Sequence, residues 1–157
     1  MKEAEEQTEA LHAYFSAVLR LRQDLRQRVQ RTLTELGYAD ISMEVTQVLY
    51  YIHFIAEGQK SNQQDIANRT GTNKSTVTSL IDNLVKRKLL LREVDPKNRR
   101  SNIITLTAEG VAFVQEVYDK VYQDFDMQHL GVTVSEINKM TQLMEQFMQQ
   151  GQEINKV

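Results

Sequence analysis

The chain lacks cysteine altogether and has only one proline and six glycines among its 157 residues. Without cysteine it cannot form a disulfide, bind a metal through thiolates or sense oxidation through a thiol. This absence fits a reducing compartment, and we predict a cytoplasmic location. Because Pro96 and the few glycines leave little to break a long helix, a mainly α-helical fold is expected.

Long hydrophobic runs are also missing. No stretch approaches the length of a membrane span, and the acidic N-terminus is not followed by the apolar core of a signal peptide. We therefore expect no membrane partner and no export. With 41% hydrophobic residues, a chain of this length can bury one core, so we expect a single unit over residues 1–157.

The net charge is only −2, but the charges are unevenly distributed. Between Ser61 and Gly110 nine Lys and Arg residues outnumber five Asp and Glu, a net of +4, so the rest of the chain carries −6. A basic module on an acidic scaffold is the electrostatic pattern of a surface that binds phosphates.

Apolar residues recur at every third or fourth position in several segments, as on one face of an amphipathic helix. The pattern predicts a long first helix over residues 5–36, which Gly37 ends. A second helix is expected to be capped by Ser42 and ended by Gly58.

Two short helices are predicted next. Asn62 and Asp65 are spaced as in a capping box, which opens a helix to about Arg69. Residues 70–73 form a tight turn, and a further helix runs to Lys88 with its apolar side chains on one face. Two short helices joined by a glycine-containing turn form a helix-turn-helix unit.

The periodicity then changes. Residues 89–95 and 102–106 are short apolar or β-branched runs, which predict a hairpin with a charged tip at Asp95–Ser101. Thr107 is expected to cap the next helix, which continues past Phe125 to a break at Gly131. A last helix begins at Thr133 or Ser135.

The outward face of the second short helix is small, hydroxylic and amide-rich. Such side chains reach base edges and phosphates when a helix enters the major groove N-terminus first. The alternative is an ordinary solvated surface. A solvent-facing helix normally carries Glu and Lys, however, and Ser, Thr and Asn are poorer helix formers than these. Asp82 is expected at the groove mouth or paired with a neighbouring basic residue. The predicted DNA-binding residues here are Thr72, Asn73, Lys74, Ser75, Thr76, Thr78 and Ser79.

The hairpin tip carries the other candidates, Lys97, Asn98, Arg99 and Arg100. Guanidinium groups on a protrusion can enter a minor groove, where A·T-rich tracts concentrate negative potential. The alternative is a loop that is charged for solubility. The cations of residues 86–88 either complement the helix dipole or contact phosphate.

Five motifs together resemble the core of the MarR family of prokaryotic regulators. They are Gln64-Asp-Ile-Ala67, Ser75-Thr-Val-Thr-Ser-Leu-Ile-Asp-Asn-Leu84, Arg92-x-x-Asp95-Pro, Asn98-Arg-Arg100 and Ile104-Thr-Leu-Thr-Ala-Glu-Gly110. The resemblance implies a winged helix whose recognition helix is Asn73–Lys88 and whose wing arginine is Arg100. Asn98 stands where the family usually has Asp, which implies a less firmly oriented arginine and a weaker wing contact.

The resemblance also implies the fold class and the domain organisation. We expect a mainly α protein with a small β-hairpin wing, in which residues 41–110 form the winged helix-turn-helix DNA-binding region. Residues 5–36 and 107–150 supply the N- and C-terminal helices of a dimerisation bundle, where Met140, Met144, Phe147 and Met148 are adaptable packing residues. The alternative is that these helices only cover their own core.

The histidines raise two further questions. Glu9 with His12, and Asp126 with His129, have the spacing of two ligands on one helical face. Because such sites need more buried carboxylates than the sequence offers, we interpret both histidines as surface residues and expect no metal and no cofactor. Members of the resembled family often bind small aromatic acids, so the candidate ligand-binding residues are Tyr50, His53 and Phe54.

We therefore predict a homodimeric, sequence-specific transcriptional regulator, a repressor that binds double-stranded DNA at a pseudo-palindromic operator and is released by a small aromatic effector. The alternative is a winged-helix module that docks to proteins and binds no duplex even at low salt. An enzyme such as a helical metal oxidase is not expected, because the sequence offers no nucleophile–base pair, phosphate loop or ligand set.

Overall fold

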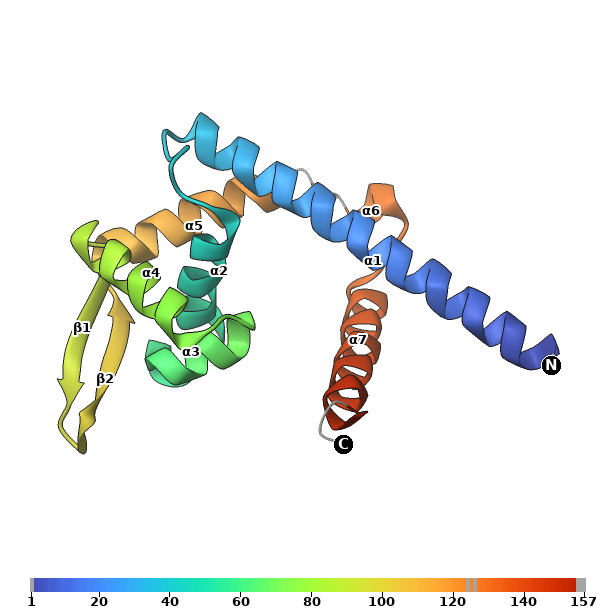
Figure 1. Ribbon diagram of the computed structural model, residues 1–157. Coiled ribbons are helices and arrows are strands. Elements are labelled where there is room, and N and C mark those ends of the chain that lie inside the picture. Colours follow the sequence, from blue (N-terminus) through green and yellow to red (C-terminus); the bar gives the residue numbers. More distant parts are fainter. Residues whose placement is uncertain (1, 124, 126, 155–157) are drawn as a thin grey trace. The chain divides into compact units, whose positions relative to one another are not determined.

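The computed structural model describes residues 2–123, 125 and 127–154, and it confirms a mainly helical chain with one antiparallel two-stranded hairpin (Figure 1). The chain divides into two compact units, one ending at Val121 and one beginning at Tyr122. None of the described helices has both the length and the apolar character needed to cross a bilayer. The elements are α1 (Lys2–Glu35), α2 (Met43–Tyr50), α3 (Gln63–Thr70), α4 (Lys74–Lys86), β1 (Leu90–Asp95), β2 (Asn98–Leu106), α5 (Ala108–Tyr122), α6 (Met127–Leu130) and α7 (Val134–Ile154).

The helix α2 differs from its prediction at both ends. Ser42 has the extended backbone of an N-cap, but its side chain accepts no hydrogen bond from the helix. At the other end the chain passes into a π-helical turn, Tyr51–Ile55, in which the Ala56 amide donates to the Tyr51 carbonyl at 2.9 Å. The predicted end at Gly58 is therefore wrong, because the helical backbone stops at Ile55 and Ala56 is extended.

The helix-turn-helix unit is confirmed by α3 and α4. Asn62 Oδ1 accepts from the Asp65 amide at 2.9 Å, and Asn62 Nδ2 donates to the Asp65 carboxylate at 2.7 Å. Gly71 follows α3 with a φ of +64°, a left-handed conformation that glycine adopts without strain. Asn73 then caps α4 by accepting from the Thr76 amide at 2.9 Å. The predicted recognition helix is thus two residues shorter at its C-terminal end than expected.

Removal of the α3 cap gives a first prediction. Asn62→Ala is expected to lower the free energy of unfolding by about 1 kcal/mol, because the Asp65 amide loses its acceptor. Asn62→Ser keeps an acceptor at the same position and is expected to lose less. Urea denaturation monitored by circular dichroism measures both variants, and equal losses would show that the cap is not the cause.

The core of the first unit draws side chains from α1 to α5, from the π-helical turn and from both strands. Their burial supplies the main favourable term in folding, about 1.5–3 kcal/mol for each large aliphatic side chain. In α1 only the last three turns take part, from Leu25 onward, so the greater part of that helix is exposed. The largest fully buried side chains are Leu33, Leu49, Ile52, Ile66, Ile81, Leu84, Leu90 and Ile104.

The hairpin is longer than predicted. The segment predicted as a charged tip, Asp95–Ser101, lies largely in β2, which begins at Asn98 instead of Asn102. Asp95 pairs with Asn98 across a two-residue turn, and its carboxylate accepts from the Lys97 amide at 2.8 Å. Because Val94 already pairs with Asn102, residues 99–101 bulge out of the ladder.

The helix α5 begins as predicted, since Thr107 Oγ1 accepts from the Gly110 amide at 2.9 Å. Its inner face is buried in the core of the first unit, through Phe113, Val114 and Val117. The helix ends at Tyr122, so the predicted continuation past Phe125 to Gly131 is wrong, and the short α6 occupies part of that segment.

In the second unit, α7 begins at a capping box. The Glu136 amide donates to Thr133 Oγ1 at 3.2 Å, and the Thr133 amide donates back to the Glu136 carboxylate at 2.8 Å. The Thr133 amide first, and then the Thr133 hydroxyl, which also donates to this carboxylate at 2.8 Å, lower the pKa of Glu136 below its usual value. Of the two predicted starts, Thr133 is therefore the cap.

Candidate nucleic-acid interface

The first turns of α4 present the side chains that the sequence singled out. Asn73, Lys74, Ser75, Thr76 and Ser79 are all exposed. Ser75 donates its hydroxyl to Asn73 Oδ1 at 2.6 Å, and the same oxygen accepts from the Thr76 amide. Over the described part of the chain, Lys74 and Thr76 make no side-chain hydrogen bond or ion pair. The surface around the N-terminus of α4 is therefore formed by small polar side chains, most of which are available to bond another molecule.

Two of the predicted residues lie apart from this surface. Thr72 precedes α4 and is half-buried, with its hydroxyl bonded to the Thr70 carbonyl at 3.3 Å. Thr78 is also half-buried, and its hydroxyl both donates to the Lys74 carbonyl at 2.9 Å and accepts from Gln63 at 3.4 Å. Their hydrogen bonds are used within the helix-turn-helix, so both serve chiefly to hold α3 and α4 together.

Asp82 does not remain an unpaired carboxylate among the polar side chains of α4. It accepts a hydrogen bond and forms an ion pair with Arg92 of β1, whose side chain is only 26% exposed. The expected pairing with a neighbouring base is thus found in the structure. The pair neutralises the one acidic side chain of the described α4 residues and ties the recognition helix to the base of the hairpin.

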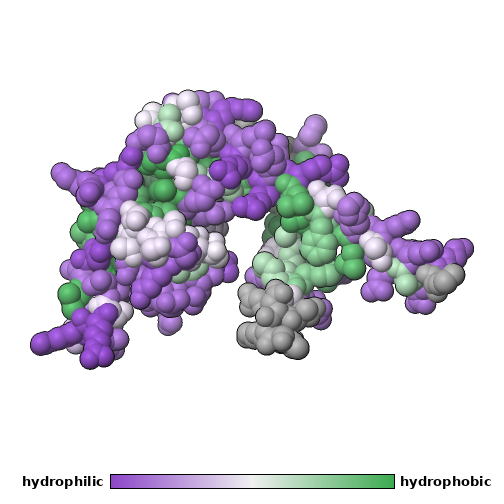
Figure 2. All heavy atoms as spheres, viewed as in Figure 1, coloured by the Kyte–Doolittle hydropathy of each residue, from purple (hydrophilic) through white to green (hydrophobic). Residues whose placement is uncertain are grey.

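The other cations lie along the hairpin. Lys97, Arg99 and Arg100 are exposed, and in the described chain their side chains have no hydrogen bond or ion pair. Asn98 Oδ1 accepts from the backbone amide of Arg100 at 3.2 Å, so it orders the bulge instead of the guanidinium. Figure 2 shows the hairpin tip, at the lower left, as a strongly hydrophilic part of this face.

The basic residues of the module therefore fall into two groups. Arg87 and Arg92 are engaged by carboxylates within the fold. Within the described chain, Lys74, Lys97, Arg99 and Arg100 are exposed and unpaired, and they carry positive charge that is available to a polyanion. The sequence alone could not separate these groups, because Arg87 and its carboxylate partner lie 47 residues apart.

The candidate ligand residues lie in an aromatic cluster at the π-helical turn. Tyr50 stacks on Tyr118 of α5 with ring centres 4.4 Å apart, and Phe54 contacts Tyr50 at 4.7 Å and His53 at 4.3 Å. Phe54 remains 52% exposed. His53 Nδ1 is buried without a hydrogen-bond partner among the described residues. The turn thus presents an apolar surface beside an unsatisfied polar atom.

No metal centre is formed by the residues that the structure describes, since no three His, Asp or Glu side chains lie together. His12 is exposed on α1 and His129 is exposed on α6. Asp126, whose spacing pairs it with His129 in the sequence, lies outside the described residues.

Comparison with known protein families gives a match over part of the chain. A sequence profile of the MarR family matches residues 40–101, which contain α2, α3, α4, β1 and the start of β2. No curated protein sequence matches the chain significantly.

Solved structures are similar over most of the chain. Reduced AbfR bound to DNA has a TM-score of 0.71 at 18% identity, with 98% of this chain and 99% of that chain covered. NadR in complex with 4-hydroxyphenylacetate has a TM-score of 0.70 at 21% identity, with 83% and 89% covered. A variant of MarR from E. coli complexed with operator DNA has a TM-score of 0.67 at 19% identity, with 88% and 95% covered. The winged-helix fold is therefore shared.

Proposed function

We propose that this chain, which has a winged-helix fold and matches the MarR family profile over residues 40–101, is a cytoplasmic transcriptional regulator of that family that binds duplex DNA through α4 and the β1–β2 hairpin. We assign it no catalytic role. We also propose that it represses, since a protein that occupies an operator blocks the same DNA to other proteins.

The observation that carries this proposal is the combination of an open helix N-terminus with unpaired cations on the neighbouring hairpin. The Ser, Thr and Asn side chains of α4 can bond base edges, while the first amides of the helix favour a phosphate. The guanidinium groups of Arg99 and Arg100 lie on a bulge, a device that re-aims side chains out of a ladder. The helix α4 thus offers side chains for hydrogen bonds to base edges, and the neighbouring hairpin offers guanidinium groups that could enter a groove.

Selection of bound fragments from a random duplex library tests the proposal. The expected result is a pseudo-palindromic consensus whose affinity falls steeply with salt, by a log–log slope of about 0.9 per phosphate contacted. The double variant Arg99→Gln/Arg100→Gln, selected in parallel, is the matched control and should enrich the consensus poorly. Absence of duplex binding at low salt would favour the protein-docking alternative instead.

We further propose that the active form is a homodimer. On α7, apolar side chains recur at helical spacing yet stay exposed within its unit, and three on α1 are exposed in the same way. A two-fold dimer would cover such faces and would present two recognition helices to two half-sites. These side chains are Phe15, Leu19, Leu21, Ile137, Met140, Met144, Phe147 and Met148.

A second prediction concerns a charge placed among the exposed apolar side chains of α7. Met144→Asp is expected to shift the chain towards monomer, because a carboxylate in an apolar contact is left without a partner. Sedimentation equilibrium measures the change, and Gln149→Asp on the same helix is the control that should leave the dimer intact. A wild-type monomer at micromolar concentration would reject this part of the proposal.

The aromatic cluster supports a third proposal, that a small aromatic acid is the effector. Tyr50 and Phe54 offer ring faces, and His53 Nδ1 has no hydrogen-bond partner among the residues that the structure describes, so a hydroxyl or carboxylate of a ligand could supply one. π-Helical turns occur often at functional sites. NadR has been solved with 4-hydroxyphenylacetate, which makes that compound the natural first probe.

Calorimetric titration with 4-hydroxyphenylacetate tests the effector site. Wild type is expected to bind, and Phe54→Ala to bind about tenfold more weakly because an aromatic contact is lost. Gel shifts with and without the compound measure release from DNA. If no heat is detected for a protein that still binds DNA, the effector assignment is wrong.

A further inference from the structure

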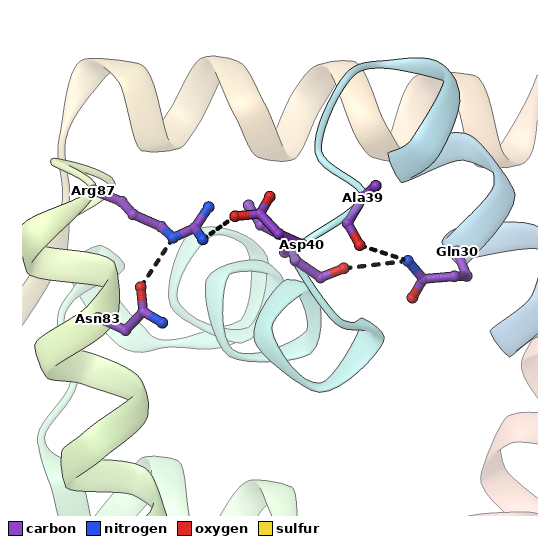
Figure 3. Close-up of polar contacts among 6 residues, drawn as sticks. Gln30, Ala39, Asp40, Asn83 and Arg87 are labelled. Atoms are coloured by element: carbon purple, nitrogen blue, oxygen red, sulfur yellow. Dashed lines mark hydrogen bonds and ion pairs between the residues drawn. The ribbon is translucent and has the colours of Figure 1, made fainter.

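The sequence predicts that the cations of residues 86–88 complement the helix dipole or contact phosphate, whereas in the structure Arg87 forms an ion pair within the fold. Arg87, at the C-cap of α4, pairs with the carboxylate of Asp40, and its Nε donates to Asn83 Oδ1 at 2.9 Å (Figure 3). The ion pair raises the pKa of Arg87 and lowers that of Asp40. The Arg87 side chain is therefore committed within the fold, and its charge is balanced there.

Asp40 lies on the loop between α1 and α2, which is held in place by packing and by hydrogen bonds. Ile41 next to it is buried, and Tyr38 packs edge-on against Phe113 of α5 with ring centres 4.8 Å apart. Gln30 of α1 reaches over the loop and donates to the carbonyl oxygens of Ala39 and Ile41 at 3.4 and 3.5 Å. A continuous set of polar contacts thus runs from α1 through the loop to the end of α4, as Figure 3 shows.

We propose that Arg87 is a positioning residue for DNA binding: through Asp40 it fixes the C-terminal end of α4 against the α1–α2 loop and so sets the direction of the helix N-terminus. The inference rests on the proposed function. A helix of 13 residues is about 20 Å long, so a tilt of about 5° at one end moves the other by about 2 Å. Hydrogen bonds to bases do not tolerate such a displacement.

The competing interpretation is that Arg87 contacts a phosphate directly, and the two make opposite predictions for Asp40. If Arg87 positions α4, Asp40→Asn and Arg87→Gln each weaken binding of the selected duplex about three- to tenfold, and the double variant is no worse than either. If Arg87 binds phosphate, Asp40→Asn leaves binding unchanged or tighter, because it frees the guanidinium and removes a negative charge.

A scrambled duplex of the same length and composition separates positioning from a general defect. A tilted α4 loses contacts to bases and keeps its contacts to phosphates, so the variants should bind the scrambled duplex as wild type does. A folding defect would lower the apparent affinity for both duplexes alike. Asp40→Glu, which retains the carboxylate, should recover most of the loss.

The exposed ion pair between Arg26 and Glu44 provides a matched control, since it joins α1 to α2 at 3.2 Å without involving α4. Arg26→Gln should leave both affinities unchanged. The inference is overturned if Asp40→Asn binds the selected duplex at least as tightly as wild type, or if the variants weaken on both duplexes equally. Failure of wild type to bind any duplex would reject the proposed function instead.

Discussion

Replacement of Gly110 by alanine is expected to lower the free energy of unfolding by about 2–4 kcal/mol, because the new methyl group would collide with backbone. A Cβ at this position would lie 2.1 Å from the carbonyl oxygen of Leu89. That oxygen also accepts a hydrogen bond from the Thr107 amide at 3.1 Å, so it cannot move without breaking the junction between β1, β2 and α5. Chemical denaturation in urea measures the loss.

Gly151 on α7 provides the control for this substitution. No atom of the described residues lies within 4 Å of a Cβ built there, and alanine is the better helix former, so Gly151→Ala should be neutral or slightly stabilising. If the two variants unfolded at the same urea concentration as wild type, the close approach of α5 to the Leu89 carbonyl would be wrong.

Arg100→Ala is expected to weaken binding of the selected duplex by about 1–3 kcal/mol, which is roughly five- to 150-fold. Arg100 is exposed and unpaired within the described chain, and its backbone is fixed on the bulge by the hydrogen bond to Asn98. Fluorescence anisotropy with a labelled duplex measures the loss, which should be largest for sites with an A·T-rich flank.

Lys97→Ala is the matched control for the wing. Lys97 lies in the turn itself, where a single ammonium can contribute only a phosphate contact. Its loss should weaken binding to all duplexes nearly equally and reduce the salt slope by about one. If the Arg100→Ala protein bound as wild type does, the wing would not belong to the interface, and α4 alone would form it.

Local signals account for most of what the sequence predicted correctly. The caps at Asn62 and Thr107 are formed by side chains within three residues of the amides that they bond, so spacing alone reveals them. The same holds for Gly71, whose left-handed conformation closes the first helix of the pair. The recognition helix and its polar face were therefore predictable without any tertiary information.

Where the structure differs from the sequence prediction, the cause lies either in residues far apart in the sequence or in a local pattern that is not marked by glycine or proline. The hairpin extends to Asn98 because a bulge absorbs the charged residues that resemble a loop in sequence. The π-helical turn and the end of α5 at Tyr122 have no glycine or proline to mark them. The partners of Arg87 and Arg92 come from other elements, and so the sequence could not show which cations remain available to DNA.

The absence of cysteine allows the central claim, that α4 and the hairpin meet the DNA, to be tested directly. Single-cysteine variants at Ser79, Lys97 and Gln115, each carrying a photoactivatable cross-linker, would be irradiated on the selected duplex. We expect efficient cross-links from Ser79 on α4 and Lys97 at the hairpin turn, and none from Gln115 on the exposed side of α5. Cross-links from Gln115, with none from Ser79 or Lys97, would contradict the account.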